Sequence, residues 1–442
     1  MPQDSSVTSR QVFAIAGPAM VANLTTPLLG VVATAAIGRL GDATLLGGVA
    51  MTSVIFDCLF WLFGFLRMST LAFTAQSLGA GHSGEVPAHL LRGLIVAGAV
   101  GLLLVALQAA LASAVIGAMG GSDAVSAAAR SYFTIRIWSA PLVLANFAVL
   151  GWLVGQARAT LALGIQVAIN LVNIAATLTL VLWFDFGITG AAVAAILAEG
   201  AGLIIGLAIA GWLFRGVLRP ARKALFDRDK LRRMFAVNRD IMIRTAALIT
   251  VFLFFTAQGA RSGDVILATN SVLNNFLMVS AFFLDGLANA AEQLCGRTLG
   301  ARDRAGFVAA TRLVILWGFA FALVVSVTYA FAGPLLIDAM TSNPELRIAA
   351  RDYLWLVTLA PLLGVFAFAF DGIFIGATWA REMRNLMLLS LVLFFAGWFA
   401  LRPFGNTGLW LALLLHYVWR GGLQALRYPA MLRLSFPPMA TR

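Results

Sequence analysis

The sequence has 442 residues, of which 61% are hydrophobic and only 11% are charged, and its mean hydropathy is +0.92. Ordinary globular domains carry about 25% charged residues, so this composition excludes a water-soluble globular protein. The net charge of +12 would fit nucleic-acid binding. However, the basic residues are scattered singly between apolar segments, apart from one cluster in the middle, and this arrangement is typical of a polytopic membrane protein.

Apolar segments recur along the whole chain at lengths that suit membrane helices. Crossing a hydrocarbon core of about 30 Å takes about 20 mostly apolar residues per helix. The sequence therefore predicts an all-α polytopic membrane protein with twelve transmembrane helices. Their approximate centres are residues 25, 62, 103, 142, 170, 200, 246, 282, 323, 361, 392 and 418.

The second half of the sequence repeats the first. The polar segments at residues 39–42 and 77–80 return about 222 residues later at 261–264 and 298–301. Each copy contains six predicted spans, so both copies enter the membrane from the same side. We therefore expect two six-helix lobes that are related by a pseudo-twofold axis along the membrane normal, as in transporters that alternate access by rocking two halves.

A basic segment separates the two copies. We predict an N-lobe at residues 1–214 with helices 1–6, a basic cytoplasmic linker at 215–234, and a C-lobe at 235–442 with helices 7–12. Residues 215–233 carry eight positive and two negative charges. Since positive charge favours the cytoplasmic side, the linker and both termini are expected in the cytoplasm, with the chain in a bacterial inner membrane.

Five groups of residues follow one another in a distinctive order: 27–30 with 37–41, 65–70 with 74–76, 238–244, 284–286 with 290–292, and 370–378. In their joint order and spacing they resemble the multidrug and toxic compound extrusion (MATE) transporters, in the branch named for DNA-damage-inducible protein F (DinF). The resemblance covers nearly the whole chain. It implies a twelve-helix, two-lobed secondary antiporter that expels cationic or amphipathic small molecules in exchange for protons or sodium ions.

The sequence departs from this family in the N-lobe. Members usually carry an aspartate in the first span and another in the fifth span, after an Asn-x-x-Asn pattern. This chain has Ala33 at the first position and Thr177, after Asn170 and Asn173, at the second. A mechanism in which N-lobe protonation bends the first helix at a hinge at Pro27 is therefore in doubt, and the sequence leaves open whether the N-lobe keeps a protonation site.

Carboxylates inside the predicted spans are candidates for function, because each costs about 2.5–3.5 kcal/mol near the bilayer centre. They are Asp57, Glu199, Asp285, Glu292 and Asp371. Under the repeat, the last three fall opposite residues without a carboxylate, so they belong to the C-lobe alone. Asp285 and Glu292 share one helix face about 10 Å apart, and can line one cavity without chelating one ion together.

We predict Asp371, Asp285 and Glu292 as ion-coupling residues. Asp371 leads, because its segment resembles an acidic tenth-helix position that related MATE branches use to bind a cation. In the alternative interpretation, the three acids accept hydrogen bonds and hold the lobe together. The candidate donors are Asn274, Asn275, Asn289 and Arg244.

Weaker intramembrane candidates are Glu199, Asp57, Arg67, Asn170 and Asn173. Glu199 is either a surviving N-lobe protonation site or a satisfied carboxyl near a helix end. Arg67 is expected to pair with a carboxylate on another helix. Asp57 is ten residues before Arg67, about 15 Å along the same helix, which makes these two improbable partners.

No catalytic residues or metal site are predicted. The histidines lack metal-ligand spacing, the two cysteines lie mid-span, and nucleotide-binding motifs are absent, so we expect no enzyme activity and no cofactor besides the coupling ion, H⁺ or Na⁺. The expected partners are a small-molecule substrate and the lipid bilayer, without nucleic acid, and the protein is expected to be a monomer. Two alternative functions are flipping of a lipid-linked or anionic amphipathic compound, and a transport-inactive binding or sensing role.

Overall fold

The computed structural model describes residues 7–39, 42–214 and 225–437, and its regular elements in these ranges are helices. Those of the first half are α1 (Ser9–Gly38), α2 (Ala43–Leu62), α3 (Phe65–Gly79), α4 (Glu85–Ala106), α5 (Gln108–Met119), α6 (Asp123–Arg136), η1 (Ile137–Ser139), α7 (Ala140–Gly155), α8 (Ala159–Thr177), η2 (Leu178–Trp183) and α9 (Gly187–Leu213). Those of the second half are α11 (Arg228–Arg261), α12 (Asp264–Gly300), α13 (Arg304–Met340), α14 (Pro344–Gly376), α15 (Ala380–Leu401), η3 (Arg402–Phe404) and α16 (Gly405–Ser435).

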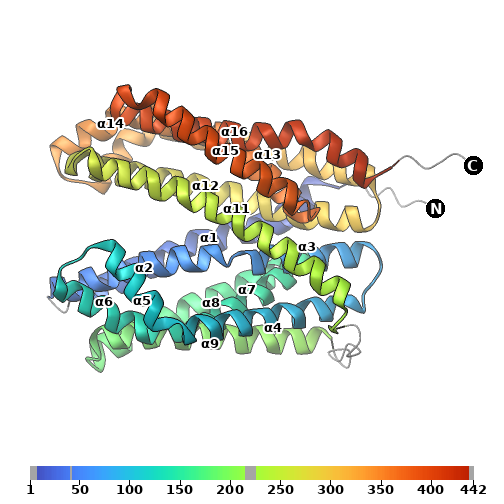
Figure 1. Cartoon of the computed structure of the whole chain (residues 1–442), viewed down its shortest axis with the longest axis horizontal. Helices are drawn as coiled ribbons and strands as arrows, with labels where there is room; N and C mark the ends of the chain where they lie inside the picture. The colour runs from blue at the N-terminus through green and yellow to red at the C-terminus, as the bar shows by residue number, and fades with distance from the viewer. Residues whose placement is uncertain (1–6, 40–41, 215–224, 438–442) are drawn as a thin grey trace, which may run out of the picture. The chain divides into compact units, whose positions relative to one another are not determined.

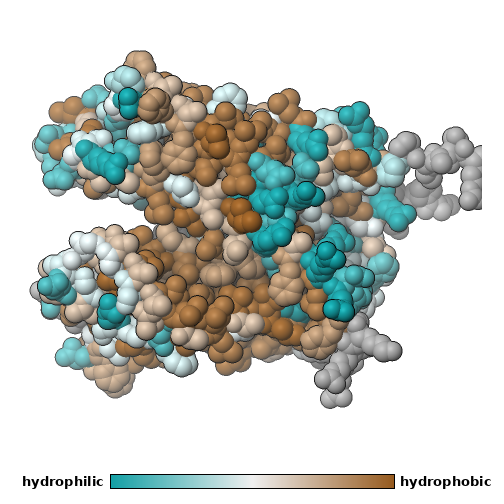
Figure 2. All heavy atoms as spheres, viewed as in Figure 1, coloured by the Kyte–Doolittle hydropathy of each residue, from teal (hydrophilic) through white to brown (hydrophobic). Residues whose placement is uncertain are grey.

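The helices have the length and composition of membrane spans. Ten continuous segments of the described residues are long and apolar enough to cross a membrane. The last of them holds both α15 and α16, and the 30-residue α1 is a further long helix, which brings the number to the predicted twelve. Figure 2 shows hydrophobic side chains over the middle of the helices and hydrophilic ones gathered toward their ends. The prediction of an all-helical polytopic membrane protein is confirmed.

The helices form two compact units (Figure 1). The C-terminal unit contains α1 up to Met20 together with α11 to α16, and the N-terminal unit contains the rest of α1 with α2 to α9 and the start of α11. Of the predicted linker, residues 215–224 lie outside the described part of the chain, and 228–234 form the first turns of α11.

The beginning of α1 packs on α13 within the C-terminal unit. The Phe13 and Trp317 rings meet edge to face with centroids 4.7 Å apart, and the indole N–H of Trp317 donates to the Ser9 hydroxyl at 3.1 Å. These contacts combine apolar burial with a satisfied indole donor. They explain why the first turns of the chain belong to the C-terminal unit.

The sequence repeat is preserved in the turns between helices. Ala157 and Thr378, one repeat apart, both have a left-handed backbone, with φ of 60° and 54°. Gly187 and Gly405, which begin the last helix of each copy, have φ of 52° and 57°. Non-glycine residues rarely adopt this conformation, so its recurrence at matching positions reflects a turn geometry that both copies retain.

The repeat is also preserved where helices cross. A Cβ atom at Gly151 of α7 would lie 2.2 Å from the backbone oxygen of Arg67, and one at Gly372 of α14 would lie 2.4 Å from the backbone oxygen of Ala288. These are equivalent positions in the two copies. Only glycine permits such close approach of two helix backbones, so the same crossing is built twice.

The two copies differ in the continuity of their helices. In the C-terminal unit α12 and α13 each run for 37 residues and α14 for 33. Their counterparts are interrupted between α2 and α3, between α4 and α5, and at η1 between α6 and α7. At the first interruption Gly64 stands where the repeat has Asp285, and glycine disfavours a continuous helix. The third has no such explanation, since Pro141 after η1 has its counterpart in Pro361 inside the continuous α14.

Candidate functional site

Asp371 lies at the centre of a buried polar cluster in the C-terminal unit. Its Oδ2 is paired with the guanidinium groups of Arg244 on α11 and Arg420 on α16. Its Oδ1 accepts a hydrogen bond from Nε2 of Gln424 at 2.8 Å. None of the four residues is more than 4% exposed. We call Asp371, Arg244, Arg420 and Gln424 the Asp371 cluster.

The local sequence explains how these groups meet. Arg420 and Gln424 are four residues apart on α16, so they project from the same face of the helix toward α14. Burying a carboxylate is costly unless charged partners and hydrogen bonds compensate, and both oxygens of Asp371 are compensated in this way. The Arg420 guanidinium also lies 5.3 Å from the centre of the Phe368 ring, which adds a cation–π contact.

Two donors and one acceptor of this cluster remain available. The Nε donors of Arg244 and Arg420 and the Oε1 acceptor of Gln424 are buried and have no hydrogen-bond partner among the described residues. One turn before Arg420, His416 is 1% exposed, and its Nδ1 lies 3.0 Å from the Ser390 hydroxyl.

The other two predicted C-lobe acids belong to the same electrostatic neighbourhood. Asp285 and Glu292 on α12 both stabilise the positive charge of Arg244 electrostatically, and Asp285 also stabilises that of Arg420. Asp285 is exposed, whereas Glu292 is 2% exposed. The structure therefore groups the three predicted ion-coupling acids around Arg244, which pairs with Asp371 and interacts electrostatically with the other two.

The N-terminal unit holds a smaller set of charges. Glu199 on α9 accepts a hydrogen bond at Oε2 from Nδ2 of Asn146 on α7, at 2.7 Å, and the same nitrogen donates to the Glu199 backbone oxygen at 2.9 Å. Arg136 at the end of α6 favours the ionised forms of both Glu199 and Asp57, the latter on α2, through its positive charge. The guanidinium of Arg136 also donates to the Tyr132 hydroxyl at 3.3 Å.

The predicted family positions of the N-lobe form a neutral polar group. Nδ2 of Asn170 donates to the Thr25 hydroxyl at 2.8 Å, and the Thr177 hydroxyl donates to Oδ1 of Asn173 at 3.5 Å. Ala33 is half-buried on α1. Pro27, the predicted hinge, also lies in α1, but its side chain is outside the described residues.

Arg67 is half-buried at the start of α3, and its backbone oxygen forms the close contact with Gly151. The electrostatic partner of Asp57 is Arg136, on a different helix. Cys58 and Cys295 are free cysteines. These residues contribute to packing and charge balance within their own units.

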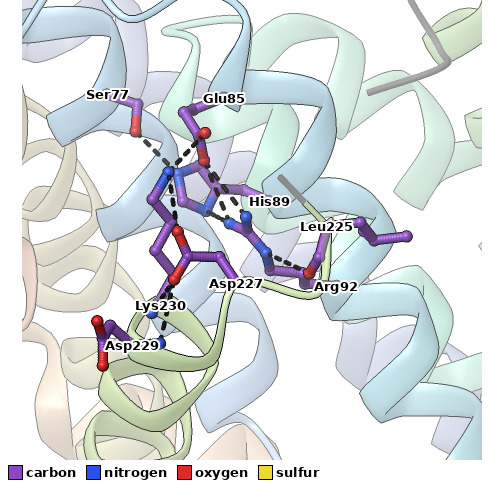
Figure 3. Close-up of polar contacts among 8 residues, drawn as sticks. All are labelled: Ser77, Glu85, His89, Arg92, Leu225, Asp227, Asp229 and Lys230. Carbon is purple, nitrogen blue, oxygen red and sulfur yellow. Dashed lines mark hydrogen bonds and ion pairs between the residues drawn. The ribbon is translucent and has the colours of Figure 1, made fainter. Parts of the chain in front are cut away.

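A further polar cluster joins the start of α11 to α4 (Figure 3). Arg92, which is 2% exposed, donates to the backbone oxygen of Leu225 at 3.1 Å and pairs with Glu85 at 3.4 Å. Lys230 pairs with the other oxygen of Glu85 at 2.7 Å. Asp227 caps α11, and the backbone N–H of Lys230 lowers the pKa of its carboxyl. This cluster attaches the end of the linker to the N-terminal unit.

Sequence reasoning missed Arg420, Gln424 and Asn146. Arg420 could have been found, because a charged residue inside the apolar last span is a functional candidate by the same cost argument that selected the acids. Gln424 follows it by one turn. Asn146 carries no charge, and nothing in its local sequence indicates that it faces Glu199.

Comparison with known proteins agrees with this architecture. The MatE family model matches residues 18–179 and 241–398. The DNA damage-inducible protein F of Escherichia coli is 38% identical over 409 residues, which cover 92% of this chain and 89% of that protein. A probable multidrug resistance protein NorM of Caulobacter vibrioides is 27% identical over 67% of this chain and 64% of that protein. A crystal structure described as MATE in the bent conformation superposes with a TM-score of 0.86, at 18% identity and 96% coverage of both chains.

Proposed function

Because the chain belongs to the MATE family of secondary transporters, we propose that it exports cationic or amphipathic small molecules in exchange for protons or sodium ions. It is a multi-pass membrane protein and not an enzyme. The proposal places it in a bacterial inner membrane as a monomer, with both termini in the cytoplasm. The positive charge of the linker supports this orientation.

One observation carries the proposed coupling. Asp371 pairs with Arg244 and Arg420, and Asp285 and Glu292 interact electrostatically with Arg244, so these three acids and two arginines sum to a charge of −1 when all are ionised. Net charge in a medium of low dielectric is costly. Uptake of one proton or one sodium ion makes the group neutral, which provides a reason for this site to bind a single cation.

The three acids have different surroundings, and we therefore give them different roles in this proposal. Arg244 and Arg420 can only donate, so they stabilise the ionised form of Asp371. In this proposal Asp371 fixes the two arginines, and the coupling ion binds at Asp285 or Glu292. Asp285 is exposed and therefore accessible to an ion or to a cationic substrate.

The proton or sodium gradient supplies the energy for this exchange. The membrane potential adds to it only when net charge moves, by about 2.3 kcal/mol per elementary charge and 100 mV. Inward movement of a proton or sodium ion can thus drive outward movement of a substrate.

The test is transport in reconstituted vesicles, with ethidium as the cationic probe and with a pH gradient or a sodium gradient imposed separately. We expect Asp285→Asn to reduce gradient-driven ethidium movement at least about tenfold, because the net charge of the group becomes zero without an ion. Asp338→Asn, at a solvent-accessible acid of the same unit, is the matched control. Unchanged movement in the Asp285 variant would contradict coupling at this group, and no movement with either gradient in the native chain would contradict the antiporter function itself.

A second candidate function is flipping of an anionic amphipathic compound. It is favoured by the buried Nε donors of Arg244 and Arg420, which have no partner among the described residues and could serve a phosphate or carboxylate. The vesicle system distinguishes the two functions when a fluorescent anionic lipid replaces ethidium. Movement of the anionic lipid, lost in Arg420→Gln, without movement of ethidium would establish this candidate.

A further inference from the structure

We propose that Glu199 on α9 is a proton-binding residue of the N-terminal unit, and that Asn146 is the positioning residue that serves both of its protonation states. This site is separate from the C-terminal acids on which the proposed coupling depends. It supplies the proton-binding group that Ala33 and Thr177 cannot provide.

The first argument is the chemistry of the partner. A carboxyl group that changes protonation state accepts hydrogen bonds when ionised and must donate one when protonated. A side-chain amide has both donors and an acceptor, so it can satisfy either state. Asn146 is 2% exposed, and its Nδ2 donates to Oε2 of Glu199 at 2.7 Å.

The second argument is an unused acceptor at the same place. Oδ1 of Asn146 is buried and has no hydrogen-bond partner among the described residues. Buried polar atoms are rarely left in this state. When Glu199 is protonated, the amide and the carboxyl can form two hydrogen bonds at once, in which Nδ2 continues to donate to the carboxyl and Oδ1 accepts its O–H. The proton comes from water and adds to the carboxylate, and no other bond is formed or broken.

The third argument is the balance of charge around Glu199. Among the elements packed against α9, the segments α7, α8, η1 and η2 carry no charged side chain. From α6, Arg136 acts on Glu199, and the same arginine is shared with Asp57 of α2. These two acids and one arginine have a net charge of −1, which one proton on Glu199 neutralises. The other charged residues of α6 are Asp123 and Arg130, toward its beginning.

The location fits the gap in the family pattern. The polar group at Thr25, Asn170, Asn173 and Thr177 contains hydroxyls and amides but no carboxylate. It lies on α1 and α8, and α8 packs against α9. In this proposal the proton-binding group of the N-terminal unit lies on α9, next to α8, and not at the family positions on α1 and α8.

The experiment reads proton binding directly and needs no substrate. The full chain is purified in detergent after growth on ¹³C-labelled glutamate, and infrared difference spectra are recorded between acidic and basic pH. The native protein is expected to show a carbonyl stretch of a protonated carboxyl that the label shifts. Glu199→Gln, which is isosteric and keeps the hydrogen bond from Asn146, is expected to lose that band.

Two further variants make the result specific. Asp57→Asn is the matched control at the other acid that Arg136 serves, and it is expected to retain the labelled band. Asn146→Leu keeps the carboxyl but removes the amide, so the band should remain with an altered frequency and an altered titration midpoint. A melting scan of each variant verifies that it is folded.

Persistence of the complete labelled signal in Glu199→Gln would overturn the proposal, and so would a titration midpoint in Asp57→Asn that is higher than the native one, because Arg136 then serves Glu199 alone. If Glu199→Gln does not fold, Glu199→Asp replaces it. Because aspartate does not carry the glutamate label, the proposal then requires that one of the bands shifted by ¹³C disappear from the spectrum. Because no transport is measured, failure of the ethidium assay does not affect this result, and failure of the infrared test leaves the C-terminal coupling proposal standing.

Discussion

Asp371 in the C-terminal unit and Glu199 in the N-terminal unit are both carboxylates inside membrane helices, yet they have opposite surroundings. Asp371 is held by two guanidinium groups and one amide, whereas Glu199 has one amide and shares a single arginine with Asp57. Two permanent cations fix the ionised form of an acid, and an amide does not. The partners of an intramembrane acid therefore decide whether it fixes neighbouring charges or changes its own.

The helices of the two units differ in their continuity. The helices around Asp371 are continuous, and those of the N-terminal unit are interrupted at Gly64, at Leu107 and at η1. Helix interruptions are positions where backbone hydrogen bonds are missing and bending is easiest. The duplicated scaffold thus contains one copy built around buried ion pairs and one copy with several sites that can flex.

The largest expected effect tests the fixed character of the Asp371 cluster. Asp371→Ala leaves the charges of Arg244 and Arg420 buried without their acid, and we expect it to lower the stability of the protein by about 3–5 kcal/mol. Thermal unfolding in detergent measures this loss. Glu199→Gln, which removes no ion-paired carboxylate, is the comparison and should melt close to the native protein. Equal melting temperatures for both variants would remove the distinction between the two acids.

The helix crossings should respond equally in the two units, because they are the feature that the repeat has kept. Gly151→Ala and Gly372→Ala each force a Cβ against a backbone oxygen, and each is expected to cost about 1–3 kcal/mol. Gly164→Ala and Gly397→Ala are matched controls, since nothing lies within 4 Å of a Cβ at either position. A large difference between the two crossing variants in a melting experiment would show that the copies no longer share this geometry.

The attachment of α11 to the N-terminal unit depends on polar contacts. Arg92→Ala removes the hydrogen bond to Leu225 and the pair with Glu85, and charged hydrogen bonds of this kind contribute about 1.5–3 kcal/mol. We expect faster proteolysis at the beginning of α11. Arg232→Ala, at an exposed residue of the same helix, is the control. Identical cleavage of both variants would argue against an anchoring role for Arg92.

The smallest effect is expected at an exposed ion pair of the C-terminal unit. Arg351 and Asp338 are 2.7 Å apart, but their side chains are 45% and 32% exposed. Solvent screening limits such pairs to about 0–1 kcal/mol. Arg351→Ala should therefore leave the melting temperature nearly unchanged, in contrast to Asp371→Ala. A loss as large as that of Asp371→Ala would mean that burial is not what distinguishes the two pairs.

The sequence by itself determined the membrane class, the twelve spans, the duplication and the family. Span prediction works because hydropathy is a property of each segment alone, and a helix in lipid must satisfy its backbone internally. The repeat could be detected because the polar segments at residues 39–42 and 77–80 return at 261–264 and 298–301. The five membrane acids were found by the same local argument of cost.

Only the tertiary structure decided which partners these acids have. Asp371, Arg244 and Arg420 come together from three different helices. Glu199 and Asn146 also lie on different helices, 53 residues apart in the sequence. Such encounters depend on how helices pack and rotate, and hydropathy does not encode the direction of a single polar side chain. For that reason the sequence could place the acids in the membrane, and the packing of α7, α9, α11, α14 and α16 assigned their partners.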